Sequence, residues 1–120
     1  AKLGIYKARV ADNVTPYLDP QECGNRHGVR YVKVVDEFGH GLRIDALENP
    51  FDMTVLPCSQ QELQSAYKIN DLPDARYTFV RILGAARGVG GYDSWGAPVY
   101  PEYCVSAEKE QRAAFTIRGL

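Results

Sequence analysis

The chain has 120 residues, of which 45% are hydrophobic and 24% are charged, so it can form one compact domain but not two. Its formal net charge of −1, without any basic block, argues against binding to nucleic acid or to an anionic membrane surface. No apolar run approaches the roughly 18 to 20 residues of a membrane span, and the first residues lack a signal-peptide pattern.

The start of the chain and its cysteines bear on its origin and its compartment. Because the chain begins at Ala1 and its only methionine is Met53, we expect a processed protein or a piece of a longer one. A cytoplasmic location is favoured, with the periplasm as the alternative. An odd number of cysteines without CxxC spacing argues against a disulfide framework or a zinc site. We expect free thiols, or one bridge and one free thiol, at Cys23, Cys58 and Cys104.

The N-terminal third is predicted to hold little regular structure. Residues 3–10 alternate in hydropathy, which predicts an edge strand. Two prolines within residues 15–20 predict an extended and partly unpaired segment. Residues 21–28 are polar and contain glycine, which predicts a shaped loop. A structural role is favoured for this loop, and a ligand site is the alternative.

The middle of the chain predicts strands and one helix. Residues 29–36 alternate in hydropathy, and residues 37–41 are suited to a hairpin connection to a strand over 42–47. Residues 51–56 predict another strand, with the first, third and fifth side chains on one face. Ser59 followed by Glu62 is the pattern of a capping box, which predicts one short helix near residues 59–67.

The C-terminal third predicts the remaining strands. Residues 76–83 have the strongest strand pattern, residues 100–105 are predicted to be extended, and residues 113–118 are predicted to form a closing strand. Several short strands at regular spacing with a single helix indicate an all-β fold. We therefore predict an antiparallel β-sandwich that forms a single domain over residues 1–120.

A glycine-rich loop, GVGGYDSWG over residues 88–96, contains the only tryptophan. Four glycines in nine positions are unsuited to strand or helix, and Asp93 and Ser94 can bond the backbone of a turn. Trp95 then has two interpretations. It is an anchor packed beneath its own loop, or a stacking platform for a sugar or another flat apolar face.

No familiar catalytic motif accompanies this loop. GxSxG, P-loop and HExxH patterns are absent, and the sequence does not show which carboxylates lie together in space. His27 and His40 lie in predicted loops, where a surface role is the simplest interpretation. No residue of this chain is predicted to be catalytic or to bind a metal.

Two separated motifs resemble one enzyme family. Residues 15–17 and 20–26, TPY and PQECGNR, resemble the TPY…PxENGxR segment of large β-galactosidases of glycoside hydrolase family two. GVGGYDSWG resembles the GVGGDDSWG segment of the same C-terminal region, and PEY over residues 101–103 also matches. The resemblance spans about residues 15–120 and points to the region also called the β-galactosidase small chain domain.

This resemblance implies that the chain is part of a galactose-mutarotase-like β-supersandwich. It also implies that the catalytic glutamates lie in a separate TIM barrel, so the fragment alone should not hydrolyse β-galactosides. The implied partners are that barrel, the remainder of an oligomeric parent enzyme, and β-galactoside sugars. No cofactor is implied here, since the magnesium and sodium ions of the family lie in other domains.

The resemblance also suggests which residues contact the sugar. Trp95 matches the tryptophan that stacks on the sugar, with Asp93 and Ser94 beside it, and Asn25 and Arg26 are weaker candidates. Two alternatives are an autonomous carbohydrate-binding module that uses these residues and a purely structural domain that contributes oligomer contacts. The chain departs from the family pattern near the loop, at Cys23, Ala86, Arg87 and Tyr92.

Overall fold

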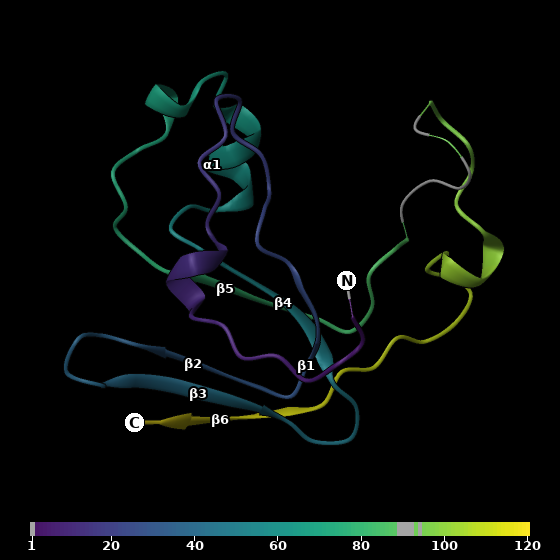
Figure 1. The fold of residues 1–120 in the computed structure, drawn as a ribbon, viewed down its shortest axis with the longest axis horizontal. Coiled ribbons are helices and arrows are strands. Elements are labelled where there is room, and N and C mark those ends of the chain that lie inside the picture. The colour runs from purple at the N-terminus through teal and green to yellow at the C-terminus, as the bar shows by residue number, and fades with distance from the viewer. Residues whose placement is uncertain (1, 89–92, 94) are drawn as a thin grey trace.

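The computed structural model describes residues 2–88, 93 and 95–120, and contains two three-stranded antiparallel sheets (Figure 1). The first sheet has the order β1-β4-β5, with β1 (Arg26–Val29), β4 (Phe51–Leu56) and β5 (Phe79–Leu83). The second has the order β2-β3-β6, with β2 (Tyr31–Val35), β3 (Gly41–Ala46) and β6 (Phe115–Gly119). The predicted all-β sandwich is confirmed.

The rest of the regular structure consists of short helical segments. The helix α1 (Gln60–Ser65) follows β4, and 3₁₀ turns form at Val10–Asn13, Ile69–Asp71 and Pro101–Tyr103. None of the helices in the described part of the chain is long and apolar enough to cross a membrane. The cysteines Cys23, Cys58 and Cys104 are free thiols, as expected.

The hydrophobic core lies between the two sheets. Because side chains alternate along a strand, β4 turns one set of residues toward the second sheet. These residues are Phe51, Met53 and Val55, which pack with Val32 of β2 and Ile44 of β3. Every residue of β4 is buried, so its polar residues are enclosed as well as its apolar ones. This central strand is therefore the part of the sandwich with the least access to solvent.

The hairpin between β2 and β3 forms as predicted. The carboxylate of Asp36 accepts hydrogen bonds from the backbone amides of Phe38 and His40, each at 2.9 Å. Val34 and Val35 of β2 pair with Leu42 and Gly41 of β3. The predicted strand over residues 29–36 is, however, divided between the two sheets. The chain bends at Arg30, which leaves Val29 in β1 and starts β2 at Tyr31.

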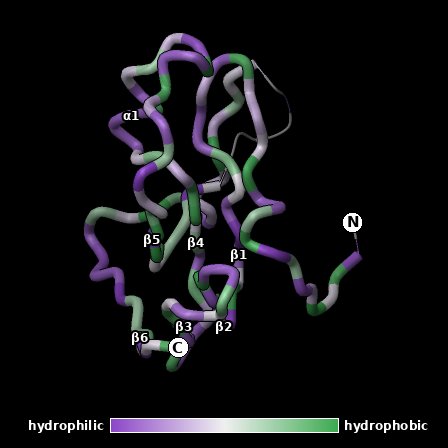
Figure 2. Tube along the Cα trace, turned by 90° about the vertical axis from the view of Figure 1, so that its left-hand side faces the viewer, coloured by the Kyte–Doolittle hydropathy of each residue, from purple (hydrophilic) through white to green (hydrophobic). Residues whose placement is uncertain are grey.

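Four further predicted segments differ from the structure. Residues 3–9 form no strand, because this segment stands away from both sheets and has no strand to pair with (Figure 2). Residues 100–105 contain a 3₁₀ turn instead of extended chain, since the fixed φ of Pro101 suits the first position of a helical turn. Residues 26–28 were predicted as loop but pair with β4, and residues 76–78 lie outside β5.

The capping box at the start of α1 is confirmed. The Ser59 hydroxyl accepts a hydrogen bond from the Glu62 amide at 3.1 Å, and the Ser59 amide donates to the Glu62 carboxylate at 2.6 Å. The helix ends at Ser65, two residues before the predicted limit. Hydrogen bonds from Ser59 hold the pKa of Glu62 below its usual value.

This pKa shift predicts a pH-dependent contribution of Glu62 to stability. Because the pKa is lower in the folded chain, the contribution is present above the unfolded-state pKa and is lost as the pH falls through the folded-state pKa. We expect Glu62→Gln to lower the urea midpoint at neutral pH and to have a smaller effect in acid, measured by far-UV circular dichroism. Glu108→Gln, whose carboxylate forms no ion pair in the described structure, is the control. An effect of Glu62→Gln that stayed constant into acid would contradict the assignment.

Candidate functional site

The chain between β5 and β6 leaves the sandwich as a long excursion, residues 84–114, which we call the arm. Figure 1 shows the arm projecting to one side of the sheets, away from α1. The outgoing and returning segments of the arm approach each other closely at two glycines. A Cβ atom on Gly84 would lie 3.2 Å from the Cβ of Ala113, and one on Gly88 would lie 2.7 Å from the Cβ of Tyr103. The Gly88 amide also donates a hydrogen bond to the Tyr103 carbonyl at 2.8 Å.

Trp95 lies on the arm and is 94% exposed. The Asp93 carboxylate accepts hydrogen bonds from the amides of Trp95 at 2.9 Å and Ala97 at 3.2 Å, which makes an Asx-type turn. Gly96 adopts φ +113°, a conformation that favours glycine. The turn role of Asp93 is confirmed, and the interpretation of Trp95 as an anchor beneath its loop is wrong. Ser94 and residues 89–92 lie outside the described residues.

Asn25 and Arg26 belong to a different part of the fold, at the start of β1. The Arg26 guanidinium donates to the Asn13 side chain at 2.5 Å and to the Asn25 carbonyl at 3.1 Å. Gly24 has φ +69°, and a Cβ there would overlap the carbonyl of Asn13. The segment before β1 is thus fastened to the 3₁₀ turn at residues 10–13. Figure 1 shows the segment before β1 beside the sheets, whereas the outer part of the arm leads away from them.

A histidine–aspartate pair is the feature that the sequence did not reveal. The Asp52 side chain is 6% exposed, and its Oδ1 lies 2.6 Å from Nδ1 of His27, whose side chain is 89% exposed. The same oxygen accepts a hydrogen bond from the Gly28 amide at 3.1 Å. Oδ2 of Asp52 and Oγ1 of Thr54 are buried and have no hydrogen-bond partner among the residues that the structure describes. Alternation along residues 51–56 predicted a strand but did not show which residue would contact Asp52, so no local signal pointed to this pair.

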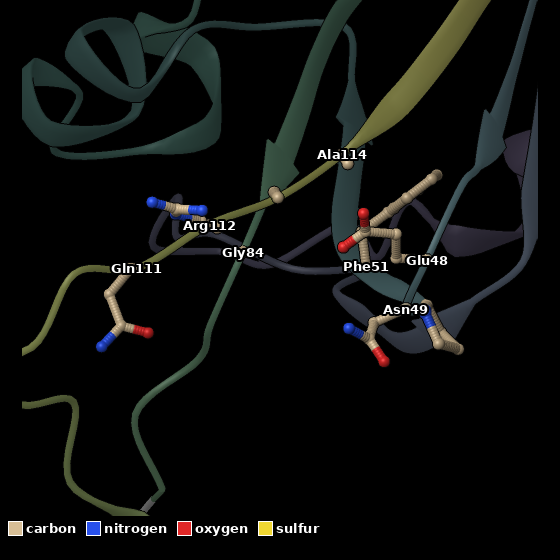
Figure 3. A pocket seen from close by; sticks show the side chains of 9 residues that line it. Glu48, Asn49, Phe51, Gly84, Gln111, Arg112 and Ala114 are labelled. Atoms are coloured by element: carbon tan, nitrogen blue, oxygen red, sulfur yellow. The ribbon is translucent and has the colours of Figure 1, made fainter.

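A hollow of about 480 Å³ lies at the base of the arm (Figure 3). It is lined by the connection from β3 to β4 and by both ends of the arm, including Glu48, Asn49, Phe51, Gly84 and Arg112. Glu48 is the one carboxylate among its lining residues, whereas glycoside hydrolysis uses a pair. Within the described residues, no three metal-ligating side chains come together to form a site.

Comparison with known proteins identifies the family. Residues 1–117 match the protein family described as beta galactosidase small chain. The chain belongs to the β-galactosidase small chain family. The match includes the arm and every strand of the two sheets up to residue 117, within β6.

Curated relatives of this small-chain region include long enzymes and one small subunit. A β-galactosidase of Halalkalibacterium halodurans is 41% identical over all of this chain, which covers 12% of that protein. β-Galactosidase BgaC of Bifidobacterium adolescentis is 42% identical over 91% of the chain and 11% of that protein. A β-galactosidase small subunit of Latilactobacillus sakei is 37% identical over 87% of the chain and 36% of that protein. The small-chain region thus spans a minor share of each relative's length.

Proposed function

We propose that this chain is the C-terminal part of a β-galactosidase of glycoside hydrolase family two, which hydrolyses terminal β-D-galactosides. Membership in the small chain family and the names of the relatives support this proposal. The catalytic carboxylates would lie in a separate TIM barrel, which needs roughly 200 residues or more and does not fit in this chain. Residues 1–120 would form one domain unit of a larger galactose-mutarotase-like supersandwich, in an oligomeric parent enzyme.

Within that enzyme, the proposed role of the arm is to carry Trp95 to the sugar. The observation that supports this role is the 94% exposure of Trp95 on a turn held by Asp93. An exposed indole loses unfavourable contact with water when a flat apolar face covers it. The C–H face of a pyranose is such a surface, and scaffolded loops are common positions for contact residues.

The proposed mechanism divides binding from bond breaking. Two barrel carboxylates would perform retaining hydrolysis, one as the nucleophile that forms a glycosyl-enzyme and the other as the acid and then the base. Trp95 would position the sugar between them without touching the bond that breaks. Asp93 would act as a positioning residue, because its carboxylate is already occupied by the amides of Trp95 and Ala97. Ser94 is proposed as a further sugar contact.

The test of this proposal is the kinetics of Trp95→Ala in the full-length enzyme, for which a lower kcat/KM is expected. The isolated chain offers a second measurement, because Trp95 is its only tryptophan. Saturable quenching of its fluorescence by a sugar would indicate an autonomous carbohydrate-binding module. The structure offers that alternative little support, since Arg26 bonds Asn13 and the Asp93 carboxylate bonds its own turn.

A further inference from the structure

The outer face of the second sheet carries a row of three cations, which we call the basic row: Lys33, Arg43 and Arg118. Lys33 of β2 lies directly opposite Arg43 of β3, and Arg43 lies directly opposite Arg118 of β6. The alternate residues Val32 and Ile44 are buried in the core, so the basic row faces away from it. Like charges in directly opposed positions destabilise a sheet, and neighbouring strands are only ~4.8 Å apart.

One member of the basic row is neutralised and held in place. The Arg43 guanidinium bonds both oxygens of Asp45, with Nε at 2.9 and 2.8 Å and Nη2 at 2.5 Å. Its central carbon also lies 4.3 Å from the centre of the Tyr31 ring. The hydrogen bond that Arg43 donates lowers the pKa of Asp45, and Asp45 therefore stays ionised at neutral pH. The charges of Arg118 and Lys33 also lower the pKa of Asp45, so its one negative charge faces three positive charges.

The two outer members of the basic row have no carboxylate bonded to them among the described residues. Lys33 and Arg118 are both exposed, and neither forms an ion pair or side-chain hydrogen bond within the part of the chain that is described. They flank the Arg43–Asp45 pair on either side and leave this face with a net charge of about +2, on a chain whose net charge is −1. This face therefore carries an excess of positive charge on a slightly acidic chain.

The same face exposes apolar surface beside the cations. Tyr31 is 46% exposed and Val35 is 44% exposed, and both alternate with the buried Val32 along β2. Every residue of the edge strand β6 is exposed. Tyrosine and arginine are enriched at protein interfaces, where apolar area at the centre lies beside charged groups. A small anion would satisfy the charges alone, whereas a polypeptide surface would also cover Tyr31 and Val35.

We propose that this face docks against a carboxylate-bearing surface of the enzyme's own polypeptide outside residues 1–120. The proposal rests on the proposed function, since it requires a larger parent, and a relative matched over the whole chain has only 12% of its length covered. Lys33 and Arg118 would each meet a carboxylate, while Arg43 stays bound to Asp45. A second copy related by a two-fold axis through this face would instead bring two basic rows together, which like-charge repulsion opposes.

Zero-length carbodiimide cross-linking of the full-length enzyme tests this proposal. The reagent joins a lysine amine to a carboxylate that contacts it, and mass spectrometry identifies both residues. We expect Lys33 to be joined to an aspartate or glutamate outside residues 1–120, and Arg118→Lys to supply a second such cross-link. Lys33→Arg is the matched control, because it keeps the charge but removes the reactive amine. Failure of both lysines to cross-link outside residues 1–120, or linkage to these residues in another copy, overturns the proposal.

Charge reversal gives a second measurement. The double variant Lys33→Glu/Arg118→Glu is expected to lower the thermal midpoint of the full-length enzyme, with a smaller deficit in ~1 M salt, where the Debye length is about 3 Å. An unchanged midpoint at low salt would count against docking. These readouts are independent of the kinetics of Trp95→Ala. Cross-linking with unaltered Trp95→Ala kinetics would retain the docking surface and remove the sugar-stacking role. A lower kcat/KM for Trp95→Ala without cross-linking would retain the sugar-stacking role and remove the docking surface.

Discussion

Replacing Trp95 by Ala in the full-length enzyme is expected to lower kcat/KM for β-galactosides by about ten- to a hundredfold. This range corresponds to the loss of ~1–3 kcal/mol, the free energy of burying a large apolar side chain. Trp95 is 94% exposed in this chain, so its removal should not disturb the sandwich. Steady-state kinetics with aryl galactosides and with disaccharides would measure the effect and divide it between KM and kcat.

Two further variants make this kinetic test specific. Trp95→Phe keeps an apolar face and is expected to recover part of the lost kcat/KM. Tyr67→Ala removes another aromatic ring, which is 86% exposed and lies just beyond α1, and is expected to leave the kinetics unchanged. Unchanged kcat and KM for Trp95→Ala on both substrate types would remove the stacking role.

His27→Ala is expected to lower the free energy of unfolding by about 1–3 kcal/mol, although its side chain is 89% exposed. The reason lies with its partner. The Asp52 side chain is 6% exposed, and without His27 its carboxylate keeps, within the described part of the chain, only the hydrogen bond from the Gly28 amide. A buried polar group that loses its partner costs its desolvation energy. Urea unfolding of the chain followed by far-UV circular dichroism would measure the loss.

The second histidine supplies a matched control. The His40 side chain is 77% exposed, and its Nδ1 lies 3.6 Å from Asp36, whose side chain is 49% exposed. Water can replace His40 there, so His40→Ala is expected to change stability by no more than about 0.5 kcal/mol. Asp52→Asn in the His27→Ala background removes the buried charge and should recover part of the loss. Equal effects of His27→Ala and His40→Ala would show that the buried carboxylate does not need its histidine.

Features that depend on a few neighbouring residues could be predicted from the sequence. The capping box of Ser59 and Glu62 and the hairpin before Gly41 are local, and both formed as expected. The strand expected over residues 3–10 failed because alternation permits a strand but does not supply a partner. The bend at Arg30 was not predicted for a similar reason. The alternating pattern continues through Arg30, although the chain changes sheets at this residue.

The site residues also differ in whether local sequence or tertiary packing determines their position. That Asp93 would hold a turn followed from its residue type, and the structure bears it out. Whether Trp95 was an anchor or an exposed contact depended on tertiary packing, which no local pattern encodes. The burial of Asp52 was not predicted, because the residue alternates along β4 with the core residues. It is buried because β4 is the central strand of its sheet and both of its faces are covered.

The close approach of Gly84 to Ala113 has an evolutionary consequence. Since the two ends of the arm meet where it joins the sheets, residues between them can be inserted or deleted without moving either sheet. Selection can therefore adjust how far the tip reaches while the scaffold stays the same. Related enzymes that favour longer or bulkier oligosaccharides are expected to differ most in the length of this segment and least in β4.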